Sequence, residues 1–223
     1  MSSIVPAVIR VTIAGIAPGL LLCNGNCATT DVQDELARLR EKNRGGEEAA
    51  RQYRQAVMRF SLYQQNGIVV LPQSMLGAAL LAGLKLTKKN KMDVQWKAQF
   101  ASSVVLNNPP LLLPEFDFKP VRSEMIIKDD RFIDVRQGRN PSTGSMLPHG
   151  LIRPFFQCWR AELHVEVDPF VIDDEALRGA FTAAGRQVGI GSWRPSFPKP
   201  GHFGRFVVVS VDAMEAMQVA VPA

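Results

Sequence analysis

The sequence contains few of the residues that most often carry metal or redox chemistry. It has three cysteines and three histidines among 223 residues. Cys23 and Cys27 are spaced so that they could supply two metal ligands, but two further ligands are missing nearby and no histidine pairs with them. We therefore expect reduced cysteines in a cytoplasmic protein, with no bound metal or other cofactor.

Long hydrophobic runs and several catalytic motifs are also missing. No stretch of about 18 consecutive apolar residues occurs, so we expect no transmembrane helix and no membrane partner. The apolar N-terminal region lacks a basic leading segment and is interrupted by Arg10, so its alternation favours a strand over a signal peptide. Motifs of the G-x-x-x-x-G-K, G-x-S-x-G and H-E-x-x-H types do not occur either, and the chain offers no catalytic centre of those kinds.

What the chain does contain is enough apolar material for a core and an excess of positive charge. The apolar fraction is 46%, the net charge is +5 and the isoelectric point is near 9.3. This length suits one globular domain that carries an insertion, and we assign the domain to residues 1–223. The positive charge favours polyanionic partners such as nucleic acid.

Hydrophobic periodicity predicts a mixed α+β chain. Alternation predicts strands at residues 8–14, 66–72, 158–168 and 205–211, and helices are expected over 31–62, 72–86 and 173–189. The proline-rich segment 103–150 has little periodicity, so we expect an insertion or an extended hairpin there. The order of elements approximates β-α-β-β-α-β, the ferredoxin-like or split βαβ plan, which is also the plan of RRM-like modules. It predicts an antiparallel sheet with helices on one face and the other face open.

The segment VGIGSWRPSFPKPGHFGRFVVV, residues 188–209, combines glycines, prolines and basic residues with no acid. Glycines permit positive φ and can expose backbone N–H groups to a phosphate, and aromatic side chains can stack on bases. A rigid surface turn whose aromatic residues cover the edge of the core is the alternative. The residues that we expect to contact nucleic acid are Arg186, Gly189, Gly191, Trp193, Arg194, Lys199, Gly201, His202, Phe203, Gly204 and Arg205.

A second aromatic and basic segment, LIRPFFQCWR, covers residues 151–160. On an open sheet its aromatic residues would stack on bases, whereas in a closed core they would only pack. We favour packing for Phe155, Phe156 and Trp159.

The paired glycine signals Gly189-Ile190-Gly191 and Gly201-His202-Phe203-Gly204-Arg205-Phe206 resemble the loop of a known group. Together with GIAPGLLL after the first strand and LPQSMLGAAL at a helix start, they are similar to the RAMP superfamily, the ferredoxin-like subunits of CRISPR effector complexes that bind guide RNA. The chain also resembles uncharacterised phage and prophage proteins with a GIGxWRP…GxFGRF ending. RNA-processing members of the superfamily carry a catalytic histidine in the N-terminal half, and here no histidine precedes His149.

The resemblance implies a non-catalytic subunit that binds single-stranded RNA, in preference to DNA, through the glycine-rich loop and the sheet face. It also implies assembly with copies of the chain or with related subunits. Two other functions stay open. The fold could make only protein contacts, as in a phage structural or assembly protein. Alternatively, His202 could serve a metal-independent ribonuclease.

Overall fold

The computed structural model describes residues 7–22, 30–42, 46–87, 94–138, 145–146, 150–168, 171–196 and 200–213. Several residues singled out in the sequence lie outside these ranges, namely Cys23, Cys27, His149 and Lys199. Helices and antiparallel sheets make up the structure, so the α+β prediction is confirmed. No helix in the described ranges is both long and apolar enough to cross a membrane.

The main sheet is built on three long antiparallel strands. Its order is β11-β1-β10-β6-β7, and β5 also pairs with β10. The strands are β1 (Ala7–Gly15), β5 (Val104–Leu106), β6 (Leu111–Leu113), β7 (Lys119–Pro120), β10 (Arg160–Val167) and β11 (Phe206–Ala213). Strand β10 alternates strictly between exposed and buried residues. One face of this strand therefore lies in the core, as the period of two in the sequence predicts.

Two helices of the core, α3 (Gln73–Thr87) and α6 (Asp174–Ala183), pack on each other. Helix α3 precedes β5, and α6 connects β10 to β11. The Asp173 carboxylate caps α6 by accepting a hydrogen bond from the Ala176 N–H at 2.6 Å. Apolar residues of both helices lie in one cluster with the buried side chains of β1 and β10. The core of the main sheet is thus the layer between its strands and these two helices.

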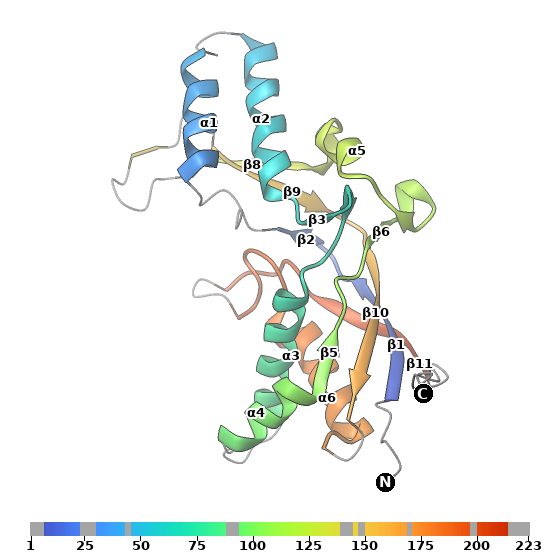
Figure 1. Cartoon of the computed structure of the whole chain (residues 1–223). Coiled ribbons are helices and arrows are strands. Elements are labelled where there is room, and N and C mark those ends of the chain that lie inside the picture. The colour runs from blue at the N-terminus through green and yellow to red at the C-terminus, as the bar shows by residue number, and fades with distance from the viewer. Residues whose placement is uncertain are drawn as a thin grey trace, which may run out of the picture.

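A second sheet lies at the other end of the molecule, beside the helices α1 and α2 (Figure 1). It has the order β2-β9-β8 and is also antiparallel. Its strands are β2 (Leu20–Leu21), β8 (Ile133–Arg136) and β9 (Leu151–Phe156), and the helices near it are α1 (Thr30–Lys42), α2 (Glu47–Ser61) and α5 (Ser123–Ile127). The segment 103–150 therefore starts in the main sheet, with β5 and β6, and ends in the second one.

The remaining elements are short. Strands β3 (Gln64–Gln65) and β4 (Ile68–Val69) form a hairpin whose turn residues, Asn66 and Gly67, both have positive φ. Helix α4 (Val94–Ser103) leads into β5, and the 3-10 turns are η2 (Pro114–Phe116) and η3 (Asp130–Phe132). A π-helical turn, η4 (Ala184–Val188), extends α6 and delivers the chain to the glycine-rich loop.

The aromatic residues of the 151–160 segment are mostly core residues. Phe156 and Trp159 are buried, and Trp159 packs edge to face on Phe206 with ring centroids 6.4 Å apart. Phe155 is half-buried. The packing interpretation is therefore confirmed for Phe156 and Trp159, while Phe155 reaches the surface near the glycine-rich loop.

Candidate nucleic-acid interface

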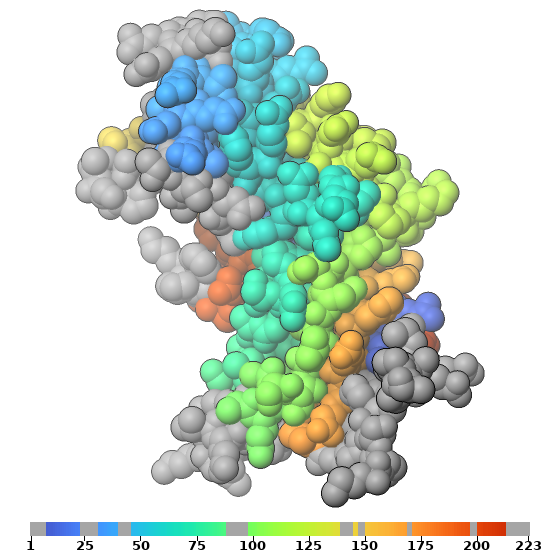
Figure 2. Space-filling model, viewed as in Figure 1, coloured from blue at the N-terminus to red at the C-terminus, as the bar shows by residue number. Residues whose placement is uncertain are grey.

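The glycine-rich loop begins where the π-helical turn ends, at Gly189. Residue Gly189 has φ 70° and its N–H donates to the carbonyl of Ala184 at 2.7 Å. From there the described chain runs to Arg205 and the start of β11, with residues 197–199 outside the described ranges. Part of this loop, drawn in orange-red, reaches the surface between the α1 end of the molecule and α3 (Figure 2).

The loop is docked on the chain that connects β1 to the second sheet. The Ser192 N–H donates to the carbonyl of Leu21 at 2.7 Å, and the Gly204 N–H donates to the carbonyl of Gly19 at 2.8 Å. A Cβ atom on Gly191 would overlap the Leu21 carbonyl, and one on Gly204 would overlap the Ile190 carbonyl. The two glycines are therefore required by close contact between backbones.

This docking corrects the role that we expected for the glycines. We expected their N–H groups to face an approaching phosphate, but those of Gly189, Gly201 and Gly204 already donate to protein carbonyls. Gly191 is buried. The prediction that these three N–H groups bind a phosphate is therefore wrong, because they donate to carbonyls of the protein itself.

Two of the predicted basic residues also hold the loop. The guanidinium of Arg194 donates to the Gly191 carbonyl at 2.8 Å and to the Ser196 hydroxyl at 3.1 Å. Arg205 donates from Nη2 to the Ala17 carbonyl at 3.4 Å. Both side chains are half-exposed, so they shape the loop and add positive charge to its surface.

The aromatic residues of the loop lie together at its outer side. The ring centroids of Trp193 and Phe203 are 6.3 Å apart, and Phe203 meets Phe155 of β9 edge to face at 6.1 Å. All three side chains are half-buried. Trp193 has φ 50°, a left-handed conformation that is rare for a bulky residue.

Two arginines of the second sheet lie over these rings. The guanidinium carbon of Arg136 is 4.7 Å from the Trp193 ring centroid and 5.0 Å from that of Phe203. The guanidinium carbon of Arg153 is 5.0 Å from the Trp193 ring centroid. Cation–π attraction at these distances stabilises both the loop and the arginines. We call this set the Trp193 cluster: Arg136, Arg153, Phe155, Trp193 and Phe203.

Sequence reasoning did not find Arg136. Arg136 lies on β8, 57 positions before Trp193, and the segment around it, RFIDVR, carries no motif. Arg153 was noted only as part of an aromatic and basic segment. Strand pairing of β8 with β9 places both arginines on one small sheet, and docking of the loop brings Trp193 to them.

Other predicted residues lie apart from the cluster. Arg186 is exposed on η4 and lines an open hollow with residues of α6, among them Arg178. His202 is exposed, and no described side chain is hydrogen-bonded to it. Among the described residues, no group of three His, Cys, Asp or Glu side chains could hold a metal ion. Cys158 is a free, exposed cysteine.

The exposed face of the main sheet carries charges of both signs. On β10 its residues are Arg160, Glu162, His164 and Glu166, and β11 adds Asp212. The Phe118 ring lies 4.2 Å from the guanidinium carbon of Arg160. The carboxylates on this face repel a phosphate backbone, so the face is a weaker candidate than the Trp193 cluster.

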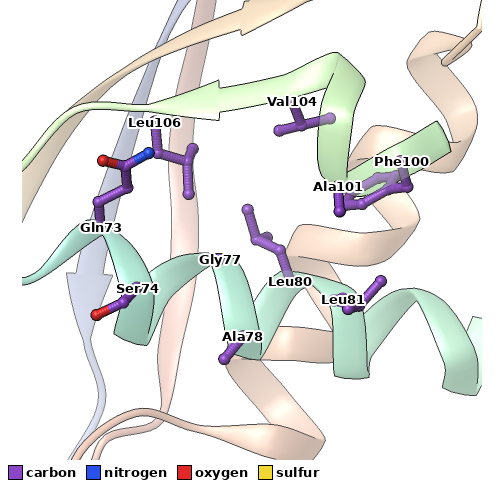
Figure 3. A pocket seen from close by; sticks show the side chains of 10 residues that line it. All are labelled: Gln73, Ser74, Gly77, Ala78, Leu80, Leu81, Phe100, Ala101, Val104 and Leu106. Carbon is purple, nitrogen blue, oxygen red and sulfur yellow. The ribbon is translucent and has the colours of Figure 1, made fainter. Parts of the chain in front are cut away.

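A groove on a different part of the molecule is apolar. It has a volume of about 390 Å³ and lies between α3, α4 and β5. Leu80, Phe100 and Leu106 are its buried lining residues, and Leu80 rises from α3 toward β5 (Figure 3). Such a groove suits an apolar side chain of a protein partner better than a nucleic acid.

No protein-family model matches this chain, and no curated protein is similar enough in sequence to count as a match. The function therefore has to be inferred from the geometry and charge of the residues themselves.

Proposed function

We propose that this protein binds single-stranded nucleic acid, with RNA favoured over DNA, and has no catalytic centre of its own. The observation that carries the proposal is the Trp193 cluster, in which two guanidinium groups lie over a half-exposed indole. Such a surface combines stacking platforms with positive charge, and unpaired bases are recognised by this combination.

The chemistry of arginine explains why the cluster suits a nucleic-acid strand. A guanidinium that stacks on an aromatic ring keeps the N–H groups along its edge in the plane of the stack. Those groups form charge-assisted hydrogen bonds with phosphate oxygens. Trp193 and Phe203 supply ring faces and edges beside these donors. A base and its neighbouring phosphate could thus be bound by residues that already lie in contact.

The sheet order supports the ferredoxin-like part of the proposal. Strands β11, β1, β10 and β5 lie side by side and antiparallel, with α3 before β5 and α6 between β10 and β11. This is the strand order expected for a split βαβ plan. We propose on this basis a RAMP-like subunit that assembles with copies of itself or related subunits along a guide-type RNA. We place its RNA contacts at the loop rather than at the sheet face.

Binding of a single-stranded RNA is expected to weaken steeply with salt. If the cluster and its neighbours neutralise about three phosphates, the slope of log affinity against log salt is about −2. Affinity then falls by about tenfold or more between about 50 and 200 mM salt. Filter binding with a short unstructured RNA, and with DNA of the same sequence, measures this slope.

Two results of that experiment would contradict the proposal. One is an absence of binding near physiological salt, and the other is a slope near zero. A duplex of the same sequence is the matched control, because its bases are not free to stack on Trp193. Equal affinity for duplex and single strand would show that the aromatic residues do not take part.

The groove between α3, α4 and β5 favours a second candidate, a structural or assembly protein that makes only protein contacts. The two candidates differ in what accompanies the protein through purification. Nucleic acid that co-purifies, seen as a raised absorbance ratio and removed by nuclease, supports the first. Its absence together with salt-insensitive oligomers supports the second.

His202→Ala is expected to leave RNA binding within about twofold of wild type and to change no RNA cleavage. The reason is that His202 is exposed and no described side chain is placed to orient its ring. A gel assay with end-labelled RNA measures cleavage. Cleavage by the wild type that disappears in this variant would establish His202 as a ribonuclease residue.

A further inference from the structure

Arg136 is held by a carboxylate of its own strand. Both oxygens of the Asp134 carboxylate accept hydrogen bonds from Nε of Arg136 at 2.9 Å. The side chains are 38% exposed for Arg136 and 16% exposed for Asp134. Because one residue separates them on β8, both side chains project from the same face of that strand.

The same guanidinium is the group that lies over Trp193 and Phe203. Its hydrogen bonds within the described part of the chain all come from Nε and all end on Asp134. Asp134 also stands opposite Arg153 in the pairing of β8 with β9. The carboxylate is therefore an anion beside the two arginines of the Trp193 cluster.

We propose that Asp134 stands in for a nucleic-acid phosphate in the free protein, and that Arg136 exchanges this carboxylate for a backbone phosphate when a strand binds. The inference rests on the proposed function, because it assigns a role to two residues of the same surface. A phosphate, like a carboxylate, offers two oxygens to a guanidinium, so the N–H that now meets both oxygens of Asp134 can meet two phosphate oxygens with little movement of Arg136. Trp193 and Phe203 hold the guanidinium in place through it.

The chain contains a matched control pair. Asp129 and Arg131 have the same spacing, and Nε of Arg131 donates to both carboxylate oxygens of Asp129 at 3.0 Å, with a further hydrogen bond from Nη2 to one of them at 2.6 Å. The hydrogen bond from the Arg131 side chain lowers the pKa of Asp129, so this carboxylate is ionised like any surface aspartate. Arg131 lies over Phe132 rather than over Trp193. Changes in this pair alter the net charge equally but leave the cluster intact.

Asp134→Asn is expected to raise the affinity for single-stranded RNA about fivefold, since it removes the competing anion. Its salt slope should stay that of the wild type, because Arg136 contacts the same phosphate in both complexes. Arg136→Gln should lower the affinity and make the salt slope shallower by about 0.7, the value for one phosphate contact fewer on a single strand. Asp129→Asn and Arg131→Gln should stay within about twofold of wild type, because the charge they change is screened at a distance.

The four variants separate the possible outcomes, and a gain of affinity cannot come from unfolding. Equal gains in Asp134→Asn and Asp129→Asn would overturn the inference in favour of a general charge effect. A loss in Asp134→Asn with unchanged thermal unfolding would overturn it as well, because Asp134 would then position Arg136 rather than compete for it. Failure of the wild type to bind RNA would instead contradict the proposed function itself.

Discussion

Replacing Gly204 with alanine is expected to lower the free energy of unfolding by about 3 kcal/mol or more. Gly204 has φ 68°, and a Cβ atom there would overlap the backbone carbonyl of Ile190. The new methyl group cannot be accommodated by a side-chain rotation, so the hydrogen bonds from Ile190 to Gly204 and from Gly204 to Gly19 have to lengthen. Urea unfolding followed by circular dichroism measures the loss.

Gly77→Ala is the matched control and is expected to raise the free energy of unfolding. Gly77 lies in the interior of α3, and the nearest neighbour of a Cβ atom there would be 3.9 Å away. Alanine in a helix interior stabilises relative to glycine by about 0.5–1 kcal/mol. A Gly204→Ala protein as stable as wild type would mean that the loop is not docked on the β1–β2 connection as the structure has it.

Trp193→Ala is expected to weaken binding of single-stranded RNA by about 10- to 100-fold, the range that corresponds to one stacked base. The substitution removes the indole that orders Arg136 and Arg153 and that forms part of the stacking surface beside them. Trp193→Phe should recover part of the affinity, because a smaller ring remains. Filter binding at fixed salt measures both, with thermal unfolding to show that the variants are folded.

Phe118→Ala controls for the loss of an exposed aromatic residue. Phe118 is 36% exposed and stacks with Arg160, as Trp193 does with its arginines, but on the face of the main sheet. Because that face also carries Glu162 and Glu166, we expect Phe118→Ala to bind single-stranded RNA with the affinity of the wild type. A comparable loss in both variants would move the binding surface to the sheet face.

Features with a local cause were predictable from the sequence. The buried residues of β10, namely Ala161, Leu163, Val165 and Val167, follow from alternation along one strand. The start of α6 follows from Asp173, because its carboxylate caps the helix by accepting a hydrogen bond from the N–H of a residue only three positions later. The helical region over 31–62, where α1 and α2 lie, and a strand within 66–72, where β4 lies, were also predicted, because periodicity is a local signal.

The glycine-rich loop shows where local reasoning ends. Its composition correctly indicated unusual backbone conformations and close approach, and positive φ is found at Gly189, Gly191 and Gly204. The partner in that close approach was predicted to be a phosphate. In the structure it is the protein's own chain, because Leu21 and Gly19 accept the hydrogen bonds of Ser192 and Gly204. No pattern within 188–209 contains information about residues so far away.

The residue types and their periods therefore determine the mixed α+β class and the faces of the long strands, and the net positive charge is one ground for proposing an anionic partner. Tertiary structure alone decides which charges meet which rings. Arg136 reaches Trp193 because β8 pairs with β9 and the glycine-rich loop docks beside these strands. Both the pairing and the docking bring together segments that are far apart in the chain. Such contacts depend on complementary surfaces of folded elements, whereas periodicity reports only the neighbours of a residue along its own element.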